Sequence, residues 1–156
     1  MSGKVAVIMG SKSDLPSMEG TFDIFKEFAV PCEPRIMSAH RTPEETANFA
    51  KTAESKGFKV IICAAGMAAH LAGVVASFTT LPVIGIPMPC EPFNGLDSLL
   101  SMVQMPPGIP VATVSAGSAG ACNSALLAIS ILALSDKNLS QKLKDFRKKQ
   151  SKKALL

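Results

Sequence analysis

Both histidines of the chain stand in short segments that follow apolar runs. His40 lies in Ser38-Ala-His-Arg-Thr42, and His70 ends a segment of small residues. An imidazole gains and loses a proton near neutral pH, so a histidine beside a bound ligand is a candidate general acid or base. Arg41 follows directly and carries a planar fork of donors that suits a phosphate. The pattern indicates proton transfer on an anionic small molecule, and the alternative is a solvent-exposed His-Arg pair in a loop.

A third polar segment, Gly10-Ser-Lys-Ser-Asp14, follows the first apolar run. It places Ser11 and Ser13 at the expected start of a helix, where free backbone N–H groups and the helix dipole suit a phosphate. Asp14 would repel a phosphate and is better suited to accept hydrogen bonds from sugar hydroxyls. Capping of the helix by Ser13 or Asp14 explains the same residues without any ligand. The segment matches neither the P-loop nor the dinucleotide-binding glycine pattern.

Seven of the ten residues from Ala64 to Gly73 are alanine or glycine, and the others are Met67, His70 and Leu71. Small residues let a backbone approach a ligand closely and leave main-chain N–H groups available to it. His70 either contacts that ligand or caps the following helix. No metal site is expected, because neither the histidines nor the cysteines have metal-ligand spacing. The four cysteines are expected to be buried free thiols: Cys32, Cys63, Cys90 and Cys122.

The elements that must position these segments alternate along the chain. Strands are predicted at Lys4–Met9, Pro34–Met37, Phe58–Ala64, Pro82–Ile86 and Pro110–Val114. Helices are predicted from about Met18 to Phe28, Pro43 to Ser55 with Thr42 as N-cap, His70 to Phe78, Leu96 to Val103, Ser118 to Leu134, and Asp136 to about Lys149. The strands are apolar on both faces, which favours an α/β protein with a parallel sheet between helix layers. Ligands bind beyond the carboxyl ends of such strands, where the three polar segments fall.

The composition bounds the class of protein. The chain has 156 residues, 47% of them hydrophobic and 18% charged, which indicates one folded domain and excludes intrinsic disorder. The charged fraction is below the ~25% of a usual soluble domain, so other copies of the chain are expected to cover some apolar surface. The predicted helix 118–134 is apolar nearly all round, and its extra burial is expected at subunit contacts.

The net charge of +4 is concentrated in one region. Residues 137–156 carry eight Lys or Arg and one acidic residue, so residues 1–136 have a net charge of −3. This basic tail is interpreted as the solvated end of a helix. Nucleic-acid binding is not expected, because the chain has no Trp or Tyr to stack on bases. No membrane or export segment is expected either, which favours a cytoplasmic location.

Four segments together resemble the PurE family of purine biosynthesis. They are Gly10-Ser-Lys-Ser-Asp14, Ser38-Ala-His-Arg-Thr-Pro43, Ala68-Ala-His-Leu71 and Leu96-Asp-Ser-Leu-Leu-Ser-Met-Val-Gln-Met-Pro106. The resemblance runs in order from about Val5 to about Leu134. It implies a single PurE-type domain over residues 1–156, with a basic C-terminal helix or tail at about 136–156. The implied fold is a flavodoxin-like, three-layer α/β/α arrangement with a five-stranded parallel sheet. The implied assembly is a homo-octamer in which the C-terminal helix packs on neighbouring subunits.

The resemblance also implies a reaction, in which N5-carboxyaminoimidazole ribonucleotide becomes 4-carboxy-5-aminoimidazole ribonucleotide without metal or organic cofactor. The substrate would lose CO2 in a closed pocket, the ring carbon would recapture it, and His40 would transfer the required proton. The ribonucleotide and CO2 are thus the expected partners. Matched residue by residue, the substrate-binding set is Ser11, Ser13, Asp14, Ser38, Arg41, Ala65, Gly66, Met67, His70 and Leu71.

Two alternatives accompany this reading. One is the carboxylase branch of the family, which adds free CO2 to aminoimidazole ribonucleotide. Arg41 and Ala68-Ala-His-Leu71 favour the mutase over that branch, in which a lysine follows the loop histidine. The other is a non-catalytic nucleotide-binding module of flavodoxin type. Within the segment around His70, the chain departs from the bacterial mutases at two positions, with Met67 in place of a usual glycine and Ala72 in place of a usual proline.

Overall fold

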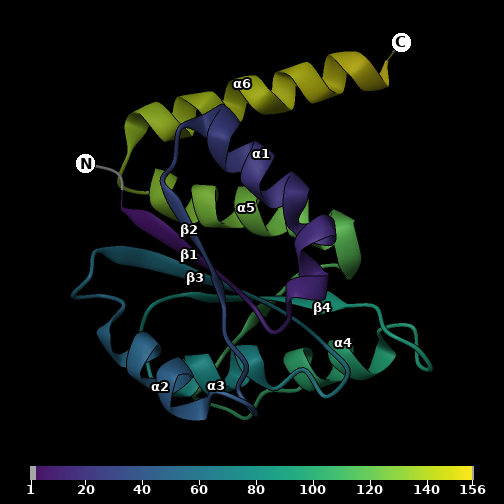
Figure 1. Cartoon of the computed structure of the whole chain (residues 1–156). Coiled ribbons are helices and arrows are strands. Elements are labelled where there is room, and N and C mark those ends of the chain that lie inside the picture. Colours follow the sequence, from purple (N-terminus) through teal and green to yellow (C-terminus); the bar gives the residue numbers. More distant parts are fainter. Residues whose placement is uncertain (1–2, 156) are drawn as a thin grey trace.

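Five parallel strands form the centre of the computed structural model, which describes residues 3–155 (Figure 1). They are β1 (Lys4–Met9), β2 (Cys32–Ile36), β3 (Phe58–Gly66), β4 (Val83–Met88) and β5 (Ala112–Thr113). The strand order is β2-β1-β3-β4-β5, and every neighbouring pair is parallel. This is the flavodoxin-like order, so the predicted parallel sheet is confirmed.

Helices cover both faces of the sheet. They are the short 3-10 helix η1 (Lys12–Met18), α1 (Glu19–Phe28), α2 (Pro43–Thr52), α3 (Leu71–Ser77), α4 (Leu96–Val103), α5 (Gly117–Ala133) and α6 (Lys137–Ala154). Helices α1 and α5 lie on one face with α6 outside them, and α2, α3 and α4 lie on the other (Figure 1). The predicted three-layer α/β/α arrangement is therefore confirmed.

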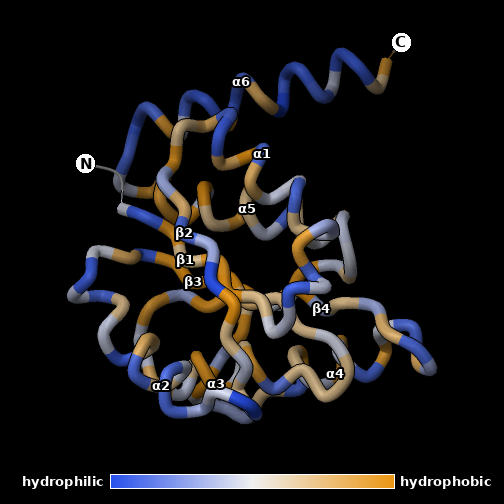
Figure 2. Tube along the Cα trace, viewed as in Figure 1, coloured by the Kyte–Doolittle hydropathy of each residue, from blue (hydrophilic) through white to orange (hydrophobic). Residues whose placement is uncertain are grey.

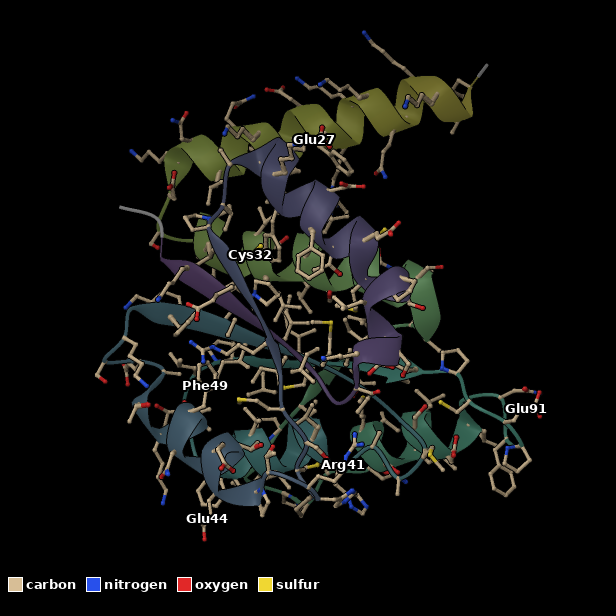
Figure 3. All side chains as sticks on the ribbon, in the orientation of Figure 1. Glu27, Cys32, Arg41, Glu44, Phe49 and Glu91 are labelled. Carbon is tan, nitrogen blue, oxygen red and sulfur yellow. The ribbon has the colours of Figure 1, made fainter. Side chains whose placement is uncertain are left out.

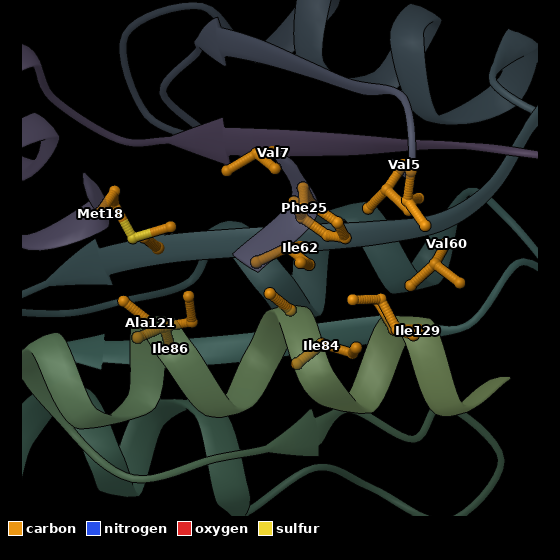
Figure 4. Packing of buried hydrophobic residues seen from close by; sticks show 14 of the residues in the cluster. Val5, Val7, Met18, Phe25, Val60, Ile62, Ile84, Ile86, Ala121 and Ile129 are labelled. Carbon is orange, nitrogen blue, oxygen red and sulfur yellow. The ribbon is translucent and has the colours of Figure 1, made fainter. Parts of the chain in front are cut away.

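The central strands are apolar because both of their faces are buried. Alternate side chains of a strand point to opposite faces, so β1 supplies Val5 and Val7 to the core beneath α1 and α5, and Ala6 and Ile8 to the core above α2 and α3. Figure 4 shows the first core, in which Ile129 of α5 packs with residues of the strands. In Figure 2 the central strands are mostly orange, whereas the outer helix α6 is mostly blue.

The edge strands differ from their predicted bounds. Strand β2 starts at Cys32 because Cys32 pairs with Val5, and it tolerates Pro34 because an edge strand has one unpaired side. Strand β5 has only two residues instead of the predicted five. Pro110 at its expected start has no N–H to donate to the sheet. The bounds of these two strands were predicted from apolar character, whereas the length of an edge strand depends on its proline residues and on which residues pair with the neighbouring strand.

The two C-terminal helices also differ in part from expectation. One face of α5 is buried, but Leu126 and Leu127 are half-buried and Leu134, just beyond the helix, is 88% exposed. Helix α6 continues to Ala154, beyond its expected end. It packs on the domain as far as Phe146, whose ring lies 5.5 Å from that of Phe28. None of the helices within residues 3–155 is long and apolar enough to cross a membrane.

Helix α1 ends at a residue that carries backbone strain. Ala29 is exposed and left-handed, with φ of 56°. Replacement of Ala29 with glycine relieves ~1–2 kcal/mol of steric cost against ~0.4–1 kcal/mol of added chain entropy in the unfolded state. We expect a net gain of ~0.5–1 kcal/mol in the free energy of unfolding, measured by urea titration. Gly57→Ala is the opposite control, because Gly57 has φ of +85° and open space around it, so strain alone should destabilise that variant.

Candidate active site

A cavity of about 550 Å³ opens at the carboxyl ends of β1 and β3. Strand order reverses between these two strands, and ligands of open α/β sheets bind at such a crevice. The lining contains all eleven residues that sequence analysis selected, together with Gly10, Ala39, Ala68, Ala69 and Cys90. Cys90 was missed as a site residue, and its signal was its position two residues after β4, the strand next to β3. Cys63 is buried as predicted, but Cys32, Cys90 and Cys122 are half-buried, so their predicted burial is wrong.

The first wall of the cavity is the start of η1. The Ser11 side chain accepts a hydrogen bond from the Ser13 backbone N–H at 3.3 Å, and the Ser11 N–H donates to Asp14 Oδ2 at 3.2 Å. The two bonds form a capping box, so the start of the helix is capped, but the cap is Ser11 and not Ser13 or Asp14 as predicted, and Asp14 is its reciprocal partner. Ser13 Oγ also donates to Ser11 Oγ at 2.9 Å. These residues cap the helix and line the cavity at the same time.

Asp14 is a charged group held mostly out of water. It is only 9% exposed, and burial raises the pKa of its carboxyl above the ordinary value, with the hydrogen bond from Ser11 opposing the shift. The folded pKa of Asp14 is higher than its unfolded pKa. The contribution of Asp14 to the free energy of unfolding is therefore fully present below the unfolded pKa, and it is lost as the pH rises through the folded pKa. At neutral pH its ionised form therefore costs stability, which a role in binding would explain.

Replacement of Asp14 with asparagine should increase stability at neutral pH. The amide carries no charge to desolvate, and its Oδ1 still accepts the hydrogen bond from the Ser11 N–H. We expect a higher urea midpoint than that of the parent chain at pH 7, and a difference that shrinks as the pH falls below the carboxyl pKa. The gain in urea midpoint of Asp14→Asn over the parent chain should be larger at pH 7 than at pH 3. A gain that is larger at pH 3 would contradict the raised pKa of Asp14.

The second wall is the loop between β2 and α2, which closes on itself. The Thr42 hydroxyl accepts from the Ser38 N–H at 2.9 Å and donates to the Ser38 carbonyl at 3.0 Å. Thr42 occupies the predicted N-cap position, but its side chain makes no bond to the N–H groups of α2, so the predicted capping bond is wrong. The hydroxyl instead holds the loop closed. Residues 39–41 are thereby presented to the cavity from a fixed turn.

Arg41 joins this loop to the first wall. Its Nη2 donates to the Gly10 carbonyl at 2.9 Å and its Nε to Ser38 Oγ at 3.4 Å. Figure 3 shows Arg41 on the side of the sheet that α2, α3 and α4 cover. A guanidinium has five N–H donors, so these two bonds leave others that can face a phosphate. Arg41 fixes the distance between two loops and contributes a positive charge to the cavity.

The two histidines meet across the cavity. His40 Nε2 lies 2.9 Å from His70 Nδ1, and the ring planes are 86° apart. One nitrogen must donate and the other accept, so at least one imidazole is neutral in this arrangement. His70 occupies the N-cap position of α3 but makes no capping bond with its side chain, so the capping interpretation of His70 is wrong. Its ring binds His40 instead.

The third wall is the small-residue segment after β3. A Cβ on Gly66 would lie 2.5 Å from Cys90 Sγ and 3.1 Å from the Met88 carbonyl oxygen, so any side chain there would require both neighbours to shift. Met67 follows with φ of 57° and is 63% exposed. The wall is therefore formed largely by main chain and methyl groups, as the sequence predicts.

A larger hollow of about 900 Å³ lies elsewhere, near the ends of α2 and α3. Its lining includes Lys51, Phe78 and Leu81 but neither histidine. The smaller cavity is the better candidate for chemistry, because it alone combines the histidine pair, an arginine and a buried carboxylate among the residues described.

Comparison with known proteins identifies relatives over nearly the whole chain. The N5-carboxyaminoimidazole ribonucleotide mutase of Saccharolobus solfataricus is 58% identical over 92% of this chain and 89% of its own length. The Bacillus subtilis protein of the same name is 51% identical over 100% of this chain and 96% of its own. The crystal structure of Treponema denticola PurE superposes with a TM-score of 0.88 and 33% identity, covering 97% and 94% of the two chains. The sequence profile of AIR carboxylase matches residues 4–153, so this chain belongs to the AIR carboxylase family.

Proposed function

We propose that this chain is an enzyme of de novo purine biosynthesis that converts N5-carboxyaminoimidazole ribonucleotide to 4-carboxy-5-aminoimidazole ribonucleotide. The observation that carries the proposal is the hydrogen-bonded pair of His40 and His70 beside Arg41 in one cavity. The chain that builds this cavity is 58% and 51% identical to relatives named as mutases of that ribonucleotide. A carboxylate transfer within one molecule needs a proton carrier and a pocket that retains CO2, and the histidine pair and the small-residue wall of the cavity suit these two tasks.

The geometry suggests how the substrate is held. Arg41 and the hydroxyls of Ser11, Ser13 and Ser38 offer donors for the phosphate and the ring. The Asp14 carboxylate offers an acceptor for ribose hydroxyls, since it lines the cavity while accepting from Ser11. The small-residue wall and His70 enclose the end of the cavity where CO2 is released. No organic cofactor or metal is required by this chemistry.

The mechanism needs one proton to move from carbon to nitrogen. A protonated His40 gives its proton to the exocyclic nitrogen as the carbon–nitrogen bond breaks, and the released electron pair stays on nitrogen while CO2 departs. Ring carbon 4 then donates electrons to CO2 and forms the new carbon–carbon bond. The neutral imidazole of His40 removes the proton from carbon 4, which regenerates its starting form. His70 fixes the orientation of the His40 ring through the 2.9 Å hydrogen bond.

Turnover with two different inputs tests the proposal. The first input is N5-carboxyaminoimidazole ribonucleotide without bicarbonate, and the second is aminoimidazole ribonucleotide with bicarbonate. Efficient use of the first, with the second effective only at high bicarbonate, supports the mutase. Use of the second alone overturns it in favour of the carboxylase. Binding of a nucleotide with no turnover of either input would favour the non-catalytic module.

The same proposal includes the assembly and location. We treat residues 1–156 as one PurE-type domain that forms a cytoplasmic homo-octamer, with α6 packing on neighbouring subunits. Exposed apolar side chains support the assembly, because Phe93, Leu96, Leu100 and Val103 follow one another at helical spacing along α4 and the residues before it. Helix α6 is exposed beyond Phe146, which leaves it available to a neighbour. Light scattering of the purified chain measures the number of subunits directly.

A further inference from the structure

Met67 has a backbone conformation that its residue type does not favour. Its φ is 57°, and only Ala29 and Asn94 share a positive φ among the non-glycine residues described. An L-residue in this region bears ~1–2 kcal/mol of steric cost, which asparagine tolerates more readily and glycine avoids. Of the three, Met67 alone has a long apolar side chain. Strain of this kind persists only where the surrounding structure imposes it.

The surroundings explain why the turn is left-handed. A Cβ on Gly66 would lie 2.5 Å from Cys90 Sγ and 3.1 Å from the Met88 carbonyl oxygen, so the end of β3 lies close against the chain at the end of β4. The His70 N–H donates to the Ala68 carbonyl at 2.8 Å, which tightens the chain before α3 begins. The backbone between these fixed points must reverse within a few residues. These contacts account for the conformation at position 67, but they do not account for a methionine there.

Core packing does not explain the methionine either. The residue is 63% exposed, so little burial offsets its strain, whereas Leu71 of the same segment is 2% exposed and packs in the core. Met67 nevertheless lines the cavity, which places it at the rim. Its neighbours Ala65, Ala68 and Ala69 are too short to reach across the opening. A methionine is flexible and apolar, and suits a surface that adapts to its contents.

We infer that the side chain of Met67 covers the cavity and retains the CO2 released during turnover. Met67 thereby determines that the ring carbon captures the released CO2 rather than external CO2. The inference rests on the proposed mutase reaction. CO2 is small and uncharged, so confinement rather than charge must hold it between the two bond changes. If CO2 escapes, external CO2 can enter and accept the same electron pair from ring carbon 4, while His40 takes the same proton. The product is the same, but its carboxylate then comes from external CO2 rather than from the substrate.

Turnover of unlabelled N5-carboxyaminoimidazole ribonucleotide in ¹³C-bicarbonate, with carbonic anhydrase present, measures this escape. The readouts are the ¹³C fraction of the product and the aminoimidazole ribonucleotide that is released without recapture. Three variants separate backbone from side chain. Met67→Ala removes the cover and keeps a β-carbon, Met67→Gly also removes the strain, and Met67→Leu keeps an apolar cover.

We expect Met67→Ala and Met67→Gly to incorporate roughly fivefold more label than the parent chain, because confinement is lost. Met67→Leu should remain near the parent value. Met67→Gly should also unfold at a higher urea concentration than Met67→Ala, which shows that the strain and the cover are separate effects. Equal labelling of the parent, Met67→Ala and Met67→Gly overturns the inference alone. No conversion of the ribonucleotide by the parent chain overturns the proposed function and this inference with it.

Discussion

Replacement of His40 with asparagine is expected to lower kcat by ~10²–10⁴-fold, the usual contribution of a positioned acid–base group. An amide cannot carry the proton from ring carbon 4 to the exocyclic nitrogen. The fold should persist, because His40 is exposed and its only side-chain hydrogen bond given by the structure is to His70. The measurement is steady-state turnover of N5-carboxyaminoimidazole ribonucleotide, with binding of the product followed by calorimetry. Binding should weaken far less than kcat falls.

His70→Asn is the matched control for this prediction. It breaks the same 2.9 Å hydrogen bond but leaves the proposed proton carrier in place. If His70 only orients the His40 ring, its loss should lower kcat much less than His40→Asn and should change the shape of the pH profile. A His40→Asn variant within tenfold of the parent kcat would remove His40 from the mechanism. Equal losses in both variants would mean that the two rings act as one unit.

The elements around the site could be predicted because local patterns specified them. Five apolar runs bounded by Gly and Pro gave the strands, and the order β2-β1-β3-β4-β5 agrees with the expected flavodoxin-like sheet. The carboxyl ends of parallel strands meet at one edge, so the polar segments after β1, β2 and β3 had to converge. That topological rule explains why all eleven selected residues line one cavity although they lie in three separate segments.

What could not be predicted depends on contacts between distant residues. The pairing of His40 with His70 joins residues thirty positions apart, and no local pattern indicates which groups the rings face. Thr42 has the type of a helix cap, but its hydroxyl finds a better pair of partners in Ser38. Cys90 enters the site only because β4 lies beside β3. In each case, tertiary geometry selects among several local options that the sequence leaves open.

At two glycines, a β-carbon would meet different obstacles. The obstacle at Gly120 is a backbone atom, and the obstacle at Gly20 is the end of a side chain. A Cβ on Gly120 of α5 would lie 1.6 Å from the Ser115 carbonyl oxygen and 3.2 Å from Ile86 Cγ2. The helix passes over its own entry segment there, at a point where it also packs on β4. A Cβ on Gly20 of α1 would instead lie 2.5 Å from Cys122 Sγ, the end of a side chain, with no backbone atom within 4 Å outside its neighbours and its own helix turn.

Gly120→Ala should therefore destabilise the fold by ~3 kcal/mol, because neither α5 nor the Ser115 peptide can move without disturbing β4. Urea titration followed by circular dichroism measures the loss, and removal of any single side chain should not restore it. Gly20→Ala is the control, and it should destabilise the parent chain. In a Cys122→Ala background the thiol is gone, so Gly20→Ala should be neutral or stabilise the fold by up to ~1 kcal/mol through the higher helix propensity of alanine. A Gly120→Ala variant as stable as the parent would show that α5 does not approach Ser115 this closely. Failure of Cys122→Ala to reverse the sign at Gly20 would show that the thiol is not the obstacle.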